Sequence, residues 1–277
     1  MKIELARCIP EPMRQGMTAE AMALAYDAST SLGKRAVLQA IAAVMESIGD
    51  PVGKFWIEDG AGKRRTYKIE QASAVVENPA VFRYLWTLPE SERKNRRSRW
   101  LTAAAIDNIA VNRATLFFAL PRGVAQEFTP HLTLIRLLAQ ADIAPQYGFG
   151  YTREYGGPDY FAVGYASNAR ARNPAEHPDR YRYARGLLLD VFPMNVLSDI
   201  HLQQRLGGAS FKEWILQNTG AESLLQIGPR SFAWFVPASC TAFISAQLKE
   251  FGLIIRGRSA ASARTLNRMG SSVRYQC

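Results

Sequence analysis

The spacing of apolar residues predicts three amphipathic helices. Residues 31–48 place apolar side chains three or four positions apart behind a Ser-Thr-Ser cluster, and Gly49 follows as a helix-ending glycine. Residues from 129 onward repeat this spacing after a Thr-Pro start. Ser210 and Glu213 form a capping box in front of a third apolar-polar repeat. Each helix is expected to bury one face.

Runs of β-prone residues predict strands between these helices. Residues 54–58 and 63–69 flank a glycine-rich turn, and 224–228 and 231–236 flank Gly-Pro, so both pairs predict hairpins. The nearly continuous apolar run 114–120 predicts a central strand. Residues 100–106, 186–192 and 253–256 are also expected to be strands.

Other stretches allow less direct interpretations. Residues 19–26 fit a strand and a helix equally well. Residues 78–89 predict a short helix that opens at Asn-Pro and closes near a proline, and Pro193 and Pro237 are each expected to open a helix. The glycine- and aromatic-rich stretch 145–165 is either an aromatic contact surface or short strands that pack rings into the core, and the core interpretation is favoured.

Helices and strands are interspersed without regular β-α-β alternation. This order predicts the α+β class, with mixed, largely antiparallel sheets and flanking helices. Residues 1–256 are expected to form a single domain, with the polar stretch 166–185 as a candidate break between two lobes. Apolar periodicity stops after Arg256, so residues 257–277 are expected to be a flexible basic tail.

The chain carries a formal net charge of +10, placed mainly in three segments. These are residues 89–100, 170–185 and 256–277, the last of which holds five arginines and no acidic residue. Such charge indicates an anionic partner, either nucleic acid or an acidic protein surface. Solvated helix faces and a loose tail explain the same pattern equally well.

The cysteines and the apolar runs indicate a cytoplasmic protein. Cys8, Cys240 and Cys277 are odd in number and fit no metal-binding spacing, so reduced thiols are expected. The first residues lack the apolar core of a signal peptide, and no run reaches about 18 apolar residues. No contact with a membrane is expected.

The sequence contains none of the catalytic motifs that would indicate an enzyme. The chain contains no HExxH, GxSxG or GxxxxGK[ST] motif, so no catalytic residue, metal or cofactor is expected. Asp190 and His201 could form a general-base or metal-binding pair, although a structural role is favoured for both. Cys240 near a helix start could be a reactive thiol, and a buried structural cysteine is favoured.

The order of these motifs resembles a bacterial family of type VI secretion immunity proteins that protect against VRR-Nuc nuclease effectors. The resemblance begins with the helix at 31–48 and the hairpin bearing Trp56. It continues through Leu-Phe-Phe-Ala-Leu-Pro at 116–121 and Tyr-Gly-Phe-Gly-Tyr at 147–151. It covers about residues 20–256, with a looser match from Gly186 to the glycine pair after Leu206, through Asn195, Leu197, His201 and Leu202. The family usually has Asn-Trp where this chain has Asn195-Val196, and the tail has no counterpart there.

This resemblance implies a non-enzymatic inhibitor that binds a cognate toxin protein in the cytoplasm and covers its active site or substrate groove, with no small-molecule substrate. Rigid aromatic, arginine and charged side chains are the expected contacts. The partner-binding residues predicted on this basis are Trp56, Glu58, Asp59, Arg96, Arg97, Tyr151, Arg153, Glu154 and Tyr155. Two alternatives stay open: a nucleic-acid-binding accessory protein that uses the basic tail, and an enzyme centred on Asp190 and His201.

Overall fold

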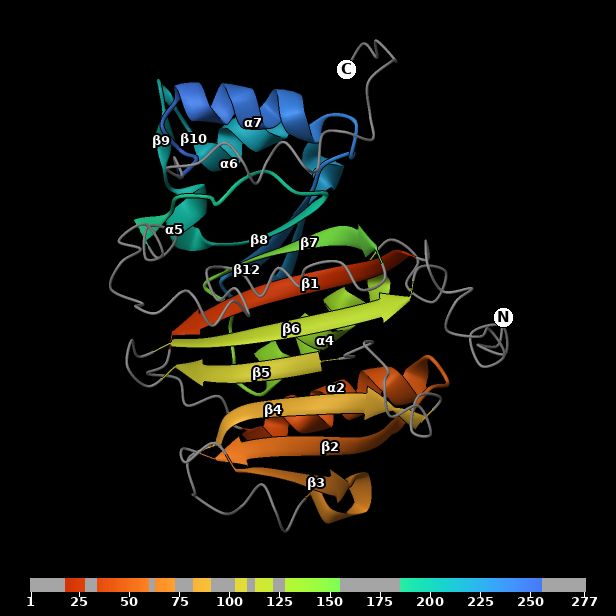
Figure 1. Cartoon of the computed structure of the whole chain (residues 1–277). Helices are drawn as coiled ribbons and strands as arrows, with labels where there is room; N and C mark the ends of the chain where they lie inside the picture. Colours follow the sequence, from red (N-terminus) through yellow and green to blue (C-terminus); the bar gives the residue numbers. More distant parts are fainter. Residues whose placement is uncertain are drawn as a thin grey trace.

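The computed structural model describes eight stretches of the chain, and Figure 1 shows their arrangement. They are residues 18–27, 34–59, 63–72, 82–90, 103–108, 113–121, 128–154 and 185–255. The helices are α2 (Lys34–Ser47), α4 (Thr129–Gln140), α5 (Asp199–Leu202), α6 (Phe211–Asn218) and α7 (Thr241–Glu250), with short 3₁₀ turns η2 (Ile69–Gln71) and η8 (Ala221–Ser223). The strands are β1 (Thr18–Asp27), β2 (Val52–Asp59), β3 (Arg64–Lys68), β4 (Phe82–Pro89), β5 (Ala103–Asn108), β6 (Arg113–Pro121), β7 (Tyr147–Glu154), β8 (Met194–Ser198), β9 (Arg205–Leu206), β10 (Ala209–Ser210), β11 (Leu224–Gly228) and β12 (Ser231–Phe235).

A ten-stranded sheet runs through the molecule in the order β11-β12-β8-β7-β1-β6-β5-β4-β2-β3. Every neighbouring pair in it is antiparallel. The fold is therefore α+β with a largely antiparallel sheet, as the sequence predicts. Strands from both sides of residues 166–185 belong to this one sheet, while most of that stretch and residues 257–277 lie outside the described parts.

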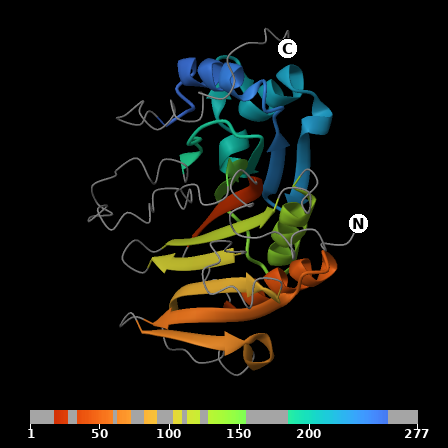
Figure 2. The same ribbon diagram turned by 45° about the vertical axis from the view of Figure 1, so that its right-hand side comes forward.

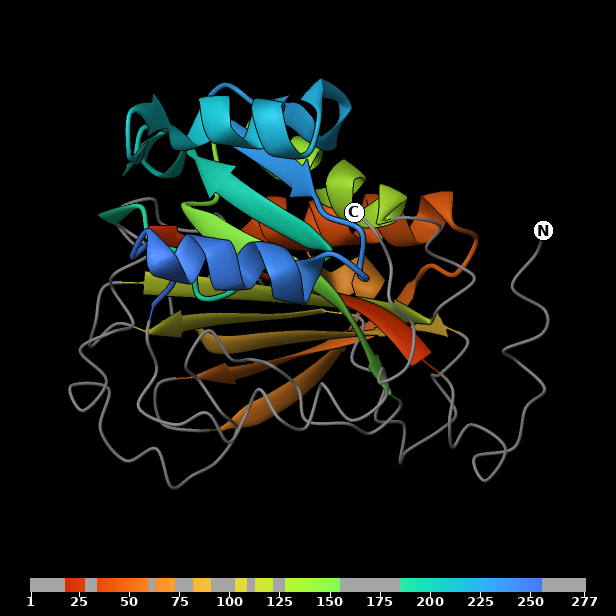
Figure 3. The same cartoon turned by 90° about the horizontal axis from the view of Figure 1, so that it is seen from above.

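Helices α2 and α4 cover one face of the sheet, which we call the helix-pair face (Figure 3). Their apolar stripes, including Val37 and Ile41 of α2 and Leu134 and Leu138 of α4, pack against Leu24 of β1 and other buried strand residues. This burial explains the spacing that predicts both helices. Gly49 ends the α2 segment with a φ of +76°, a backbone conformation that favours glycine.

The C-terminal helices cover the opposite face, which we call the C-terminal face, over the end of the sheet formed by β7, β8 and β12 (Figure 2). Phe211 and Trp214 of α6 pack edge-on against Trp234 of β12, with ring centroids 5.4 and 6.4 Å apart. The capping box predicted for α6 is present, because the Glu213 amide donates to Ser210 Oγ at 3.2 Å and Glu213 Oε2 accepts from the Ser210 amide at 2.6 Å.

Strand β1 lies between β6 and β7 and is buried on both faces, which resolves residues 19–26 as a strand. Its large side chains, Met22, Leu24 and Tyr26, join the core under α2 and α4. Its alanines, Ala21, Ala23 and Ala25, join the other core, where they lie opposite larger side chains of the neighbouring strands. Small residues on one face thus make room for aromatic rings.

Strand β7 shows the complementary pattern. Tyr147, Phe149 and Tyr151 all lie in the core of the C-terminal face, which confirms the core interpretation for this part of the glycine-aromatic stretch. Between them, Gly148 and Gly150 face the helix pair, where space is short. A Cβ on Gly148 would lie 2.7 Å from the Ala23 carbonyl oxygen. The alternation of glycine and ring therefore follows from close packing on both faces.

Two sequence predictions around prolines are wrong. The part of residues 78–89 that is described forms strand β4 instead of a helix, because β2 and β5 pair with it on both sides. The residues after Pro193 form strand β8 before the short helix α5, since β7 and β12 capture them in the sheet. A proline directly before a strand does not interrupt its hydrogen bonds.

Residues 186–192 and the described residues 253–255 do not form the strands predicted for them. They make an isolated parallel bridge between Leu188 and Ile254 instead. The Leu188 amide donates to the Leu253 carbonyl at 2.9 Å, and the Ile255 amide donates to the Leu188 carbonyl at 2.7 Å. This bridge joins the start and the end of the C-terminal stretch.

We predict that Gly148→Ala destabilises the fold by about 1–3 kcal/mol, because its methyl group would press on the backbone of β1. Urea unfolding measures the change. Gly208→Ala is the matched control, since a Cβ there would meet nothing within 4 Å and its φ is not in the left-handed region. Equal stability of the two variants would contradict this account of β7.

Candidate functional site

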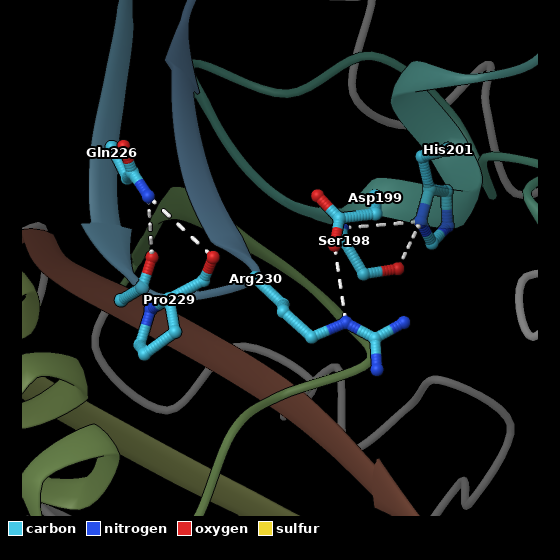
Figure 4. A network of polar contacts seen from close by, with 7 residues as sticks. Ser198, Asp199, His201, Gln226, Pro229 and Arg230 are labelled. Atoms are coloured by element: carbon cyan, nitrogen blue, oxygen red, sulfur yellow. Dashed lines mark hydrogen bonds and ion pairs between the residues drawn. The ribbon is translucent and has the colours of Figure 1, made fainter.

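A polar network lies where β8 runs into α5, close to the turn between β11 and β12 (Figure 4). The His201 ring bonds back to Ser198, with Nδ1 accepting from the Ser198 amide at 3.3 Å and lying 2.9 Å from Ser198 Oγ. Arg230 in the turn donates from Nε to Asp199 Oδ2 at 3.1 Å. These contacts cap α5 and tie it to the hairpin.

His201 is buried and stacks on the Tyr147 ring, with centroids 5.3 Å apart. Burial lowers the pKa of His201 to about 4, although the backbones of Leu187 and Ser198 oppose that shift. Its Nε2 makes no hydrogen bond of normal geometry. A neutral, enclosed imidazole of this kind holds neighbouring elements together and presents no reactive atom to solvent.

Asp190 and His201 share no hydrogen bond, although sequence reasoning considers them as a pair. Asp190 Oδ1 accepts from the Val191 amide at 2.9 Å and from the Ser245 hydroxyl of α7. Its contacts therefore fasten the chain before β8 to α7, in a structural role. Arg205 donates to the Gly208 carbonyl at 2.8 Å. Cys240 is a partly buried free thiol directly before α7.

Within the described stretches, no group of three His, Cys, Asp or Glu side chains gathers closely enough to hold a metal ion. None of the helices in these stretches combines the length and apolarity needed to cross a membrane.

A second group of residues lies on the β2–β3 hairpin at the other end of the sheet. Trp56 is half-buried, and its ring centroid is 5.8 Å from Lys54 Nζ, within reach of a cation–π contact. Across the hairpin, Lys54 is paired with Lys68 and Trp56 with Thr66. Paired residues share a face, so these four residues form one patch, which we call the hairpin surface.

The hairpin surface juxtaposes like charges, because Lys54 and Lys68 are directly opposite each other. Like charges at directly opposed positions of a sheet repel each other, so a bound anionic group would relieve the repulsion between these two lysines. In the backbone register of the sheet, Trp56 is also paired with Trp86 of β4. An aromatic group beside cations suits contact with an anionic macromolecule.

The other predicted contact residues fall in different places. Tyr151 is 7% exposed and packs beside Phe149 and Phe192, so its ring is in the core and the prediction of a surface contact is wrong for it. The rest are placed only through their strands or not at all. Glu58 and Asp59 end β2, Arg153 and Glu154 end β7, and Arg96, Arg97 and Tyr155 lie outside the described residues.

The hairpin and β7 do not form one site. Strands β1, β6, β5 and β4 separate β2 from β7, which places the two about 24 Å apart at about 4.8 Å per strand. Sequence reasoning missed Lys54 and Lys68 as members of the hairpin surface. The alternation of side chains in the two predicted strands could have placed them beside Trp56.

Comparison with known proteins gives a likeness in fold but none in sequence. The chain matches no protein-family model, and no curated protein matches its sequence. The solved structure of the Pseudomonas aeruginosa T6SS protein PA0821, a protein of the type VI secretion system, is similar to this chain with a TM-score of 0.55. The alignment covers 87% of this chain and 78% of that chain at 12% identity. This likeness shows a shared fold.

We predict that the fold loses stability in mild acid. Burial lowers the pKa of His131 to about 3 and that of His201 to about 4, from about 6.5 when unfolded, so protons bind preferentially to the unfolded chain. The stability is complete above pH about 6.5 and is lost as the pH falls toward the folded values. Each histidine is expected to cost about 2 kcal/mol between pH 7 and pH 5, measured by urea unfolding.

Two variants show whether His131 and His201 cause this pH dependence of the stability. His201→Asn keeps an acceptor near Nδ1, and His131→Gln keeps a donor near Nε2, which lies 3.2 Å from the Glu20 carbonyl oxygen. Neither amide titrates, so each variant should lose about 2 kcal/mol less than the wild type over the same pH range. An unchanged pH dependence in both variants would show that other groups are responsible.

Proposed function

We propose that this chain is an immunity protein that binds a cognate type VI secretion toxin, expected to be a nuclease, in the cytoplasm. It acts without catalysis, by covering the active site or substrate groove of the toxin. The observation that carries this proposal is the fold shared with a type VI secretion protein over 87% of the chain. The motif order that resembles an immunity family supports it independently.

The architecture suits inhibition by contact. Both faces of the central strands are sealed by large apolar clusters, so the sheet presents its loops and edges on a rigid frame. Binding through a preorganised surface avoids the entropy cost of ordering flexible segments. In the described part of the chain, the polar contacts around Asp190 and His201 serve to join structural elements.

We assign the toxin contact first to the hairpin surface. Trp56 offers a half-buried ring of the kind that dominates binding energy, and Lys54 and Lys68 offer charge for an acidic patch on the toxin. Glu58 and Asp59 at the end of β2, together with Arg96, Arg97, Arg153, Glu154 and Tyr155, remain predicted contacts. Tyr151 is removed from this set because it is buried.

A nucleic-acid-binding accessory function is the second candidate. The facing Lys54 and Lys68 and the net charge of +10 favour it, because phosphate backbones attract clustered cations. The two functions differ in their response to salt. Binding to nucleic acid falls steeply as salt rises, whereas a toxin complex with an apolar centre resists salt.

We predict that co-expression of this chain rescues bacteria from the toxin encoded beside it. Survival is measured with the toxin induced alone, with the wild-type chain, and with an unrelated immunity protein as control. Rescue by the wild type alone supports the proposal. Equal killing in all three cultures would end it, and salt-sensitive binding to DNA or RNA without rescue would favour the accessory function.

We predict that Trp56→Ala combined with Lys68→Glu weakens toxin binding at least about tenfold, because it removes the aromatic anchor and reverses a charge. Titration calorimetry measures the affinity, and thermal melting checks the fold. Phe243→Ala is the control, since Phe243 is an aromatic residue of α7 that is 57% exposed, and α7 lies at the opposite end of the molecule from β2 and β3 (Figure 1). Unchanged affinity in a folded double variant would show that the toxin binds to a different surface of this chain.

A further inference from the structure

The two outer strands of the sheet differ in how they resist pairing with other chains. Strand β3 forms one edge and carries the exposed Arg65 and Lys68, and charge of this kind discourages edge-to-edge contact. Strand β11 forms the other edge of the described sheet. Its sequence, Leu-Leu-Gln-Ile-Gly, contains no charged residue and no proline. Only the first edge has the usual protection.

The exposed part of β11 is uncharged and includes one apolar side chain. Leu225 is 37% exposed and Gln226 is exposed, while Ile227 is buried under the helix pair. The pairing of β11 with β12 is regular from Leu224 to Gln226 and shifts register between Gln226 and Gly228. The regular half, Leu224–Gln226, is therefore the part suited to accept another strand.

We propose that β11 pairs with β11 of a second copy of this chain in an antiparallel, twofold-symmetric arrangement that joins the two sheets. Pairing of Leu224–Gln226 with its symmetry mate sets Leu225 opposite Leu225 of the second copy. Directly opposed side chains approach to about 5 Å, so the two leucines shield each other from water. The contact is isologous, as in most homodimers.

Charges at the two ends of β11 complement each other in this arrangement. Glu222 is exposed just before the strand. Arg230 lies in the turn just after it, where its Nε donates to Asp199 of the same chain while 74% of the Arg230 side chain stays exposed to a second carboxylate. Antiparallel pairing brings Glu222 of one copy toward the turn that holds Arg230 of the other, twice per dimer. Within one chain the length of the strand keeps these two residues apart, so their attraction favours only the pairing of copies.

Local features at the turn set the limits of the contact. Gln226 Nε2 donates to the Gly228 carbonyl at 3.2 Å and to the Pro229 carbonyl at 3.5 Å (Figure 4). These two carbonyl groups, at the C-terminal end of β11, therefore already have a hydrogen-bond donor within the chain. The paired region is thus short and buries less than a standard interface. The dimer is accordingly weak and forms at high protein concentration.

Sedimentation velocity over roughly a hundredfold range of concentration tests this proposal. The wild type should shift from monomer to dimer, and Leu225→Lys should stay monomeric or weaken the dimer at least about tenfold, because it places two like charges face to face. Phe243→Lys is the control, because it makes the same change at a more exposed apolar residue of α7, 57% exposed against 37% for Leu225, and it should dimerise as the wild type does.

The charge pairs give a second, independent measurement. Glu222→Lys alone should weaken the dimer, and Glu222→Lys with Arg230→Glu should restore it, because the attraction is then reversed in sign. Thermal melting shows that each variant is folded, and Glu222→Lys decides the matter if Leu225→Lys does not fold. A wild type that stays monomeric throughout, or a dimer that ignores both Leu225→Lys and Glu222→Lys, would overturn the proposal.

Discussion

The exclusion of water from both faces of β1 constrains the rest of the molecule. A strand in this position must carry apolar side chains in both directions, and the available width decides their sizes. Its alanines leave room for Phe117 and Phe149, while its larger residues reach the helix pair. On the neighbouring strand β7, Gly148 and Gly150 are needed for the same reason, because a Cβ at either position would clash with atoms packed against it. Small residues are therefore as decisive here as large ones.

The same constraint divides the sheet into two regions with different roles. The end around β8 and β12 is enclosed by α6 and α7, and its buried polar groups, such as Asn195 with bonds to Phe192 and Trp234, serve packing. At the hairpin end, Lys54 is half-buried and Lys68 is exposed. A partner bound there, as we propose, would leave the enclosed end undisturbed.

Much of this fold can be predicted from sequence where local chemistry decides it. The caps of α6 and the glycine after α2 mark helix ends because the groups concerned are neighbours in the chain. Strands β4 and β8 were not predictable in this way, since their state depends on partners far away in sequence. At the candidate site, Trp56 could be placed on a hairpin, but the burial of Tyr151 depends on Phe192, which no local pattern reveals.

The bridge between Leu188 and Ile254 has a consequence for the order in which contacts can form while the chain is being synthesised. Strand β1 can pair with β6 and β7 once residue 154 has been made, whereas Leu188 can reach its backbone partner only after residue 254 has been made. During synthesis the contacts of β1 are therefore available before the bridge that joins the two ends of the C-terminal stretch.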